Sequence, residues 1–213
     1  MHTGILRAAI AASAVVLASS AFAGVNLIQD GDFSNPNLGG SWSLWSPGIN
    51  GWVSGNDAIE IGYSPIYGLP CANAGCQNLE VNANTFGSVG QIVTGLVVGQ
   101  WYTLSYLYGG RTEGGPDSLD VYFGGQYLGS DSGSVGYWTA NAFHFQASAT
   151  SETLAFVAAD RSGQGGWPSY GNEITNVSLS AVPETSTWAM MLAGFAGLGF
   201  AGFRVRRRAV AAF

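Results

Sequence analysis

The segment from residue 24 to residue 182 alternates short apolar runs with clusters of glycine, asparagine, aspartate and serine. Within several runs, apolar and polar side chains also alternate, so that Leu119, Val121 and Phe123 fall on one side of an extended chain. A period of two residues is typical of a strand with one buried face. We therefore predict strands at Val25–Asp30, Gly51–Ser54, Ala58–Ile61, Asn78–Val81, Val89–Thr94, Trp101–Tyr108, Leu119–Phe123, Thr139–Ala147, Thr153–Ala158 and Ile174–Ser180.

No apolar pattern of helical period occurs before Trp188, and Gly124-Gly125 suits a tight hairpin because glycine tolerates positive φ. Many short strands joined by frequent turns favour two packed antiparallel sheets. We predict one all-β domain over residues 24–181, an antiparallel two-sheet jelly-roll sandwich. An N-terminal signal peptide and a C-terminal transmembrane helix are predicted to flank it.

Residues 1–23 have the three parts of a secretory signal peptide. Arg7 supplies the positive start, residues 8–18 are small and apolar apart from Ser13, and Ala21-Phe22-Ala23 fits a cleavage site. We therefore expect the chain to be exported.

The C-terminal region contains an uncharged run of sixteen residues, 188–203, followed directly by a basic cluster at 204–208 and a short tail at 209–213. At about 1.5 Å per residue, a helix over this run spans roughly 24 Å, somewhat less than a hydrocarbon core. Arginines remain on the cytoplasmic side of a membrane, so this segment predicts a single transmembrane helix with the sandwich outside.

Only 9% of the residues are charged, there is no lysine, and 32 residues are glycine. Twelve of the thirteen acidic residues lie between Asp30 and Glu173, where Arg111 and Arg161 are the only basic residues. Binding to nucleic acid depends on Lys and Arg to neutralise phosphates. We therefore expect no nucleic-acid partner.

Cys71 and Cys76 are the only cysteines, separated by four residues. In an exported protein such a pair predicts a local disulfide. A zinc site would need further ligands at suitable spacing, which this segment lacks.

Antiparallel alternation brings the loops 109–117, 129–138 and 159–172 to the same end of the predicted sandwich. Aromatic rings can cover the C–H surface of a sugar, while arginine and carboxylate groups bond its hydroxyls. These loops therefore predict a glycan site. A second interpretation is also open, in which the aromatic residues only cap the core and Arg111 pairs with a nearby acid. The candidate ligand-binding residues are Arg111, Trp138, Asp160, Arg161, Trp167 and Tyr170.

No nucleophile, phosphate-loop, dinucleotide or zinc-protease motif occurs in the chain. Glu113, Asp117 and Asp120 could act as a glycosidase pair, but their spacing specifies no such geometry. We predict that the protein is not an enzyme.

The segment Val182-Pro183-Glu184-Thr185-Ser186-Thr187-Trp188, with the apolar run and arginine cluster after it, resembles the PEP-CTERM sorting signal. The resemblance covers residues 182–208, and its motif spans 182–187, with Pro183, Glu184 and Thr185 as the sorting residues; Thr185 stands where the family has a second proline. It implies an exosortase-type enzyme as partner and a Gram-negative bacterium as host. The protein is then exported across the inner membrane, anchored there by one C-terminal helix, and passed to the cell surface or extracellular matrix.

The body of the chain resembles the galactose-binding-like jelly-roll domains. The matching segments are Asn26–Phe33, Gly51-Trp52, Val98–Ser105, Phe143–Phe145, Thr153–Phe156 and Ile174–Leu179. Some relatives hold a structural Ca²⁺ between the first and last strands, and the resemblance implies Asp30, Asp32 and Glu173 as its ligands here. Thr175 replaces an aspartate that is common in the family. No other cofactor is expected.

Together these features predict an exported, exosortase-sorted envelope or matrix protein, with a non-catalytic module that binds extracellular polysaccharide. Two alternatives stay open: a structural, self-associating surface adhesin without a sugar site, and a hydrolase of polysaccharide.

Overall fold

The computed structural model describes residues 24–55, 58–113, 118–159, 168–183 and 189–200. The chain divides into two compact units, one covering Phe22–Pro183 and the other formed by the two chain ends. In the second unit, residues 189–200 form a helix. Among the described residues, no helix has the length and apolar character needed to cross a membrane. The predicted signal peptide, Glu184, Thr185 and the basic cluster lie outside the described residues.

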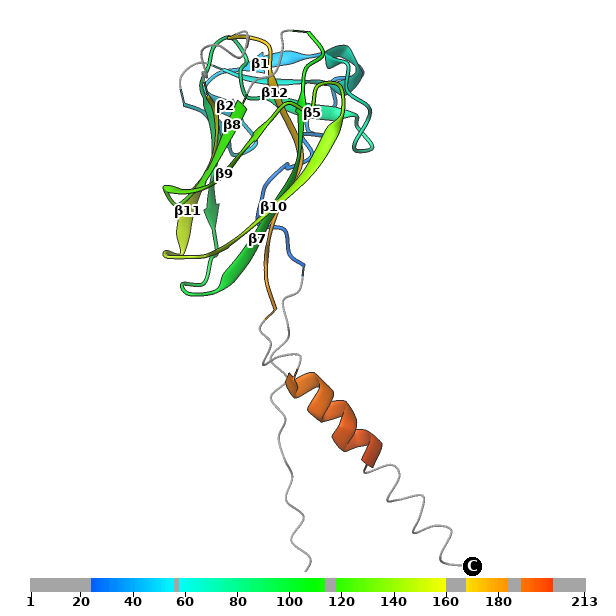
Figure 1. Ribbon diagram of the computed structural model, residues 1–213, viewed down its shortest axis with the longest axis vertical. Coiled ribbons are helices and arrows are strands. Elements are labelled where there is room, and N and C mark those ends of the chain that lie inside the picture. Colours follow the sequence, from blue (N-terminus) through cyan, green and yellow to red (C-terminus); the bar gives the residue numbers. More distant parts are fainter. Residues whose placement is uncertain (1–23, 56–57, 114–117, 160–167, 184–188, 201–213) are drawn as a thin grey trace, which may run out of the picture. The chain divides into compact units, whose positions relative to one another are not determined.

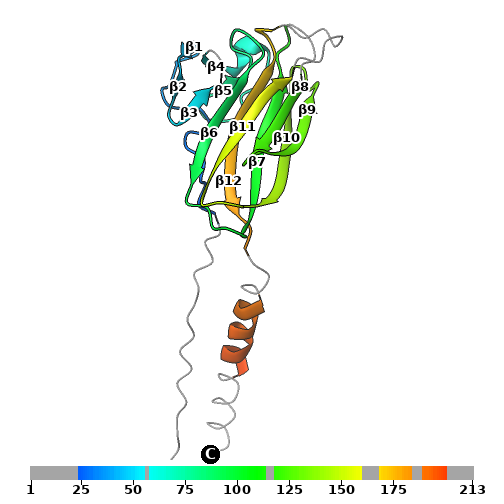
Figure 2. The same ribbon diagram turned by 90° about the vertical axis from the view of Figure 1, so that its left-hand side faces the viewer.

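The first unit is a sandwich of two six-stranded sheets in which every strand pairing is antiparallel, as predicted (Figures 1 and 2). The first sheet has the order β1 (Ser43–Trp45), β4 (Ile59–Tyr63), β5 (Gln77–Glu80), β12 (Asn172–Ala181), β7 (Trp101–Gly110) and β10 (Trp138–Gln146). The second has the order β2 (Gly48–Ile49), β3 (Trp52–Ser54), β6 (Ser88–Thr94), β11 (Ser151–Ala159), β8 (Ser118–Phe123) and β9 (Gln126–Ser132). A short 3₁₀ helix, η1 (Ser64–Tyr67), follows β4.

The core forms where the inner faces of the two sheets meet. Trp52 is one of its largest buried side chains, with its ring 5.3 Å from that of Phe33 and 6.3 Å from that of Phe156. Its indole N–H donates to the Gln29 carbonyl at 2.9 Å, so this large side chain is buried without losing its hydrogen bond. Trp42, by contrast, is exposed.

The predicted strand Val25–Asp30 is not a strand, although it lies along β12. Leu27 N–H donates to the Leu179 carbonyl at 2.9 Å, and Val177 N–H donates to the Gly31 carbonyl at 2.9 Å. Asp30 has φ 45°, which bends the chain before a regular ladder forms. The register of β12 also shifts between Thr175 and Ser178.

The sandwich has two loop ends, which we name by their residues. The arginine end comprises residues 64–72, 110–113, 133–138 and 168–171, and the backbone hydrogen bonds Arg111 N to Gly171 O (3.1 Å) and Gly110 N to Ser134 O (3.0 Å) join its segments. The valine end comprises residues 24–26, 95–101, 146–151 and 181–183, joined by Leu96 N to Thr150 O (3.1 Å) and Val182 N to Trp101 O (2.8 Å). The strands therefore return three of the predicted glycan-site residues to one end, as antiparallel alternation implied.

Candidate functional site

Three glutamates lie side by side on adjacent strands at the arginine end. Glu60 of β4 pairs with Glu80 of β5, and Glu80 pairs with Glu173 of β12. The neighbouring residues Ile61, Leu79 and Ile174 are fully buried in the core. Because side chains alternate along a strand, the three glutamates project from the opposite, outer face of the first sheet. Glu80 and Glu173 are nevertheless completely buried, because loops cover that face.

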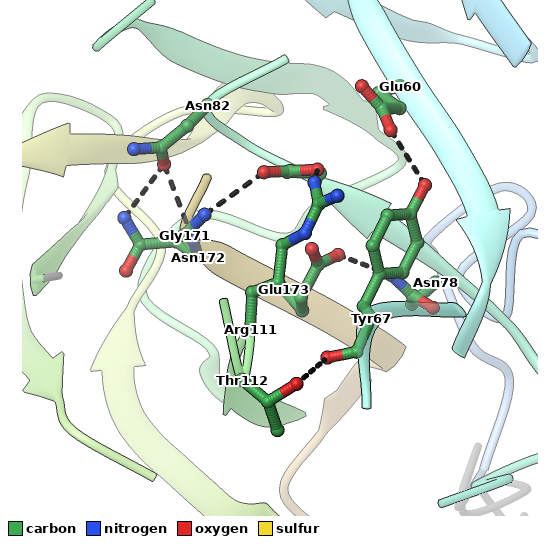
Figure 3. Close-up of polar contacts among 10 residues, drawn as sticks. Glu60, Tyr67, Asn78, Asn82, Arg111, Thr112, Gly171, Asn172 and Glu173 are labelled. Atoms are coloured by element: carbon green, nitrogen blue, oxygen red, sulfur yellow. Dashed lines mark hydrogen bonds and ion pairs between the residues drawn. The ribbon is translucent and has the colours of Figure 1, made fainter. Parts of the chain in front are cut away.

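Arg111 is the cation of this cluster. Its Nη1 donates to Glu80 Oε2 at 3.0 Å, and its guanidinium carbon lies 4.6 Å from the Tyr67 ring centroid and 4.3 Å from that of Tyr170. Two aromatic faces therefore enclose one guanidinium, an arrangement that is favourable when the cation is shielded from water. Figure 3 shows the Arg111 side chain beside Glu173. The Tyr67 ring lies next to Arg111, and its hydroxyl is bonded to Glu60.

Further hydrogen bonds tie the covering loops to these carboxylates. The Tyr67 hydroxyl donates to Glu60 Oε1 at 2.7 Å, the Gly171 N–H donates to Glu80 Oε1 at 3.0 Å, and the Asn78 amide donates to Glu173 Oε2. Two buried atoms, Arg111 Nε and Glu173 Oε1, have no hydrogen-bond partner among the described residues.

Burial raises the pKa of all three carboxyl groups. Desolvation comes first for Glu80, followed by the charge of Glu60, and together they raise its pKa to about 8 against the opposing effect of Arg111. Desolvation also raises the pKa of Glu173, with Glu80 and Glu60 adding to the shift. Desolvation raises the pKa of Glu60, while the Tyr67 hydrogen bond and Arg111 lower it. One arginine cannot neutralise three buried carboxylates, so the cluster retains protons where free glutamates would be ionised.

This arrangement is suited to holding loops in place rather than to reaching a substrate. Its carboxylates are buried beneath Arg111, whose own side chain is only 14% exposed. The glutamates fasten η1, the segment 110–113 and the segment 168–171 to the outer face of the first sheet. The chemistry it can perform on its own is the uptake and release of protons.

The structure brings Arg111, Trp138 and Tyr170 together at the arginine end, as predicted, and all three have internal partners, since the Tyr170 ring packs against Arg111. Arg111 bonds Glu80, and the Trp138 indole N–H donates to the Pro70 carbonyl at 2.7 Å. The other predicted residues, Asp160, Arg161 and Trp167, lie outside the described residues.

Sequence reasoning missed Glu60, Glu80 and Tyr67. Glu60 stands between two isoleucines and Glu80 between a leucine and a valine, in the pattern of solvent-facing positions of ordinary strands. The available signal was a glutamate inside each of two predicted strands and a third directly before another, Ile174–Ser180, with few basic residues to balance them.

The three residues named for a structural Ca²⁺ each have partners within the protein. Asp30 Oδ2 accepts from Asn50 Nδ2 at 2.8 Å, Asp32 Oδ1 accepts from Ser34 Oγ at 3.0 Å, and Glu173 belongs to the Arg111 cluster. Within the described ranges, no three or more acidic, histidine or cysteine side chains are grouped as metal ligands.

The side-chain amide of Asn73 lies between the first and last segments of the sandwich and is surrounded by oxygen atoms. Asn73 Nδ2 donates to the Asp32 carbonyl at 3.1 Å, to the Gln77 carbonyl at 2.9 Å and to Thr175 Oγ1 at 2.9 Å. The threonine at 175 thus accepts a hydrogen bond at the position where the resemblance implied an aspartate.

The predicted disulfide between Cys71 and Cys76 is present. It closes the loop that supplies the Pro70 carbonyl to Trp138 and the Asn73 amide to the oxygen cluster. The disulfide therefore supports the same end of the sandwich as the glutamate ladder.

No known family profile matches the chain. The chain is similar to halomucin of Haloquadratum walsbyi, with 30% identity over 165 residues; the match covers 72% of this chain and 2% of halomucin. The chain therefore spans only a small fraction of the length of this relative.

Among solved structures, the chain is similar to the xylan-binding domain CBM22-1 of Paenibacillus barcinonensis Xyn10C, with TM-score 0.44 and 10% identity over 68% of this chain and 98% of that domain. It is also similar to TmCBM61 in complex with β-1,4-galactotriose, with TM-score 0.42 and 15% identity over 75% of this chain and 100% of that one. These proteins are carbohydrate-binding modules by name. At TM-scores below 0.5, the likeness carries no argument about what this chain binds.

Proposed function

We propose that this chain is an exported, non-catalytic module that binds extracellular polysaccharide through the arginine end. The observation that carries the proposal is the grouping of Tyr137, Trp138 and Tyr170 at one end of the sandwich, where Trp138 bonds the Pro70 carbonyl and Tyr170 packs against Arg111 of the buried ionic network. Tyr137 is 57% exposed, and Trp138 and Tyr170 are partly exposed. Exposed aromatic faces at a fixed position are the surface that sugar rings require.

Arg111 has a different part in this proposal from that expected from the sequence alone. Held between Tyr67 and Tyr170 and bonded to Glu80, it positions the aromatic platform instead of bonding the glycan. A platform that is ordered before the ligand arrives loses less entropy on binding. Polar contacts to sugar hydroxyls come from the exposed residues Thr112 and Glu113 of the same loops.

Asp160, Arg161 and Trp167 lie outside the described residues and belong to the proposed site on the sequence alone. They belong to the connection between β11 and β12, and β11 ends at Ala159 while β12 begins at Asn172 at the arginine end. This connection supplies a further tryptophan and the second arginine of the body.

The test is polysaccharide binding measured by affinity electrophoresis and calorimetry, with xylan, β-1,4-galactan and the exopolysaccharide of the producing bacterium as ligands. Tyr137→Ala is expected to weaken binding about tenfold, the equivalent of roughly 1.4 kcal/mol. Trp101→Ala is the matched control, because Trp101 is 51% exposed but lies at the valine end. Equal effects of the two substitutions, or saturable binding to none of these ligands, would contradict the proposal.

The proposal includes export and sorting. The signal-peptide pattern of residues 1–23, the PEP-CTERM-like segment at 182–208 and the disulfide support it. We expect an exosortase-type partner to process the C-terminal segment after export. Intact mass of the mature protein and loss of a C-terminal tag in the presence of an exosortase test this, and a full-length mass in every fraction would refute it.

Self-association is a second candidate function, favoured by the outer face of the second sheet. Val53, Gly90, Ala155, Tyr122 and Tyr127 form one row across five strands, and Val53 and Tyr127 are each more than half exposed. An exposed apolar row can pair with a second copy. A sedimentation coefficient that does not change with protein concentration would exclude this function.

A further inference from the structure

The valine end exposes apolar side chains in one short turn between β6 and β7. Val97 is 63% exposed, Val98 is 59% exposed, and Trp101 follows at the start of β7. The turn is well supported: Val97 N–H donates to the Tyr102 hydroxyl at 2.9 Å, and Gly99 N–H donates to the Ala147 carbonyl at 2.8 Å. These apolar side chains are therefore held outward by an ordered backbone.

Charged residues are absent from all four segments of the valine end, 24–26, 95–101, 146–151 and 181–183. The adjacent acid, Glu152, is almost fully buried, because its Oε1 accepts hydrogen bonds from Ser148 N–H at 2.8 Å and Ala149 N–H at 3.0 Å. The carboxylate closes its own turn and is not presented to solvent. An uncharged loop end is unusual in a region that elsewhere carries nearly all the acids of the chain.

The chain leaves the sandwich at this same end. Val182 N–H donates to the Trp101 carbonyl at 2.8 Å, and Gln100 Nε2 donates to the Val182 carbonyl at 2.6 Å. Figures 1 and 2 both show the end of β12 beside the start of β7. Four residues, 184–187, then precede the uncharged run 188–203 and its arginine cluster. Even fully extended, four residues reach only about 14 Å.

We propose that the valine end is a membrane-contacting surface, with Val97, Val98 and Trp101 seated in the interfacial layer of a lipid bilayer. The proposal rests on the predicted insertion of the run 188–203, since so short a connection keeps this end of the sandwich close to the bilayer. Tryptophan favours the interface between lipid and water, and exposed valines gain by leaving water. Charged side chains would oppose such contact, and this end has none exposed.

The proposal separates the functions of the two ends. The valine end faces the bilayer, and the arginine end faces outward with its aromatic side chains. A glycan site at the arginine end would remain accessible while the chain is anchored. Glycan binding does not depend on this inference, because its test uses other residues and another readout.

The test uses the full chain reconstituted in vesicles of phosphatidylethanolamine and phosphatidylglycerol. Val98→Cys carries a nitroxide label, and Val135→Cys, an exposed valine of the arginine end, carries the same label as the matched control. Cys71 and Cys76 are joined in the disulfide and do not compete for the label. Collision rates with oxygen, which concentrates in lipid, and with a water-soluble nickel chelate report the position of each label.

The label at 98 is expected to lose accessibility to nickel and gain accessibility to oxygen on reconstitution, while the label at 135 keeps its solution values. In a Val97→Asp, Thr150→Cys variant, a label at 150 is expected to become accessible to nickel, compared with Thr150→Cys alone. Chains that float with vesicles but give equal nickel accessibility at 98 and 135 would overturn this inference alone. Chains that fail to float would overturn both the inference and the predicted membrane insertion of 188–203, while leaving glycan binding untouched.

Discussion

Different interactions hold the loops at the two ends of the sandwich. At the arginine end, loops lie over three buried carboxylates, one guanidinium and two tyrosine rings, and each polar group fixes a particular backbone segment. At the valine end, the turns close through backbone hydrogen bonds, and apolar side chains remain exposed. Buried polar groups are costly unless paired, so the network at the arginine end specifies one loop arrangement. That arrangement then depends on every member of the network. The valine end leaves its surface free for an apolar partner.

The largest effect is expected from Arg111→Ala. Removal of the guanidinium leaves Glu60, Glu80 and Glu173 buried without a cation, which typically costs about 3–5 kcal/mol. Urea unfolding followed by tryptophan fluorescence measures the free energy of unfolding. Trp101→Ala at the valine end is the control, and an equal loss in the two variants would show that the network contributes no special stability.

A second expectation concerns pH. The folded-state pKa of Glu80 is raised to about 8 from an ordinary value of 4.5, so the folded protein binds a proton that the unfolded chain releases. This contribution to stability is fully present below pH 4.5 and is lost as the pH rises through about 8. The slope is at most about 1.4 kcal/mol per pH unit for each proton retained.

Unfolding free energies measured between pH 5 and pH 9 test this expectation. Glu80→Gln keeps the hydrogen-bonding shape but removes the titration, so its profile should be flatter over this window. A wild-type stability that rises with pH would refute the raised pKa. Glu152→Gln, beside the valine end, tests whether a flatter profile is specific to Glu80.

The disulfide offers a third test of the arginine end. Replacing Cys71 and Cys76 by serine is expected to cost roughly 2 kcal/mol, because a small closed loop constrains little of the unfolded chain. The loss should be accompanied by faster hydrogen exchange at the Gln77 N–H, which donates to Asn73 Oδ1 of that loop. If the variant loses the same stability but exchange there is unchanged, the disulfide acts by constraining the unfolded chain and not by holding this loop.

Much of the fold could be predicted from the sequence, because strict alternation identifies strands such as β7 and β8 and their direction determines which loops meet. The ion pair could not be predicted, since Arg111 bonds a residue 31 positions away whose strand position depends on register. One of the two interpretations of the sequence paired Arg111 with an acid close to it in the chain. The first segment was misread for a related reason: its apolar residues follow a strand pattern, but the positive φ of Asp30 interrupts the ladder.

The smallest effect is expected from Trp138→Phe, which probes a single hydrogen bond of the arginine end. The substitution keeps a ring next to Gly109 but removes the donor to the Pro70 carbonyl. A bond of this kind contributes about 1 kcal/mol net, so the midpoint of urea unfolding should decrease slightly while the slope stays constant. Trp101→Phe provides the matched substitution at the valine end, where the ring is exposed.

Because the glycan proposal places Trp138 on the platform, the affinity of the protein for polysaccharide should decrease in the Trp138→Phe variant. A variant that loses stability but binds polysaccharide as before would restrict Trp138 to a structural role and leave Tyr137 and Tyr170 as the aromatic contacts.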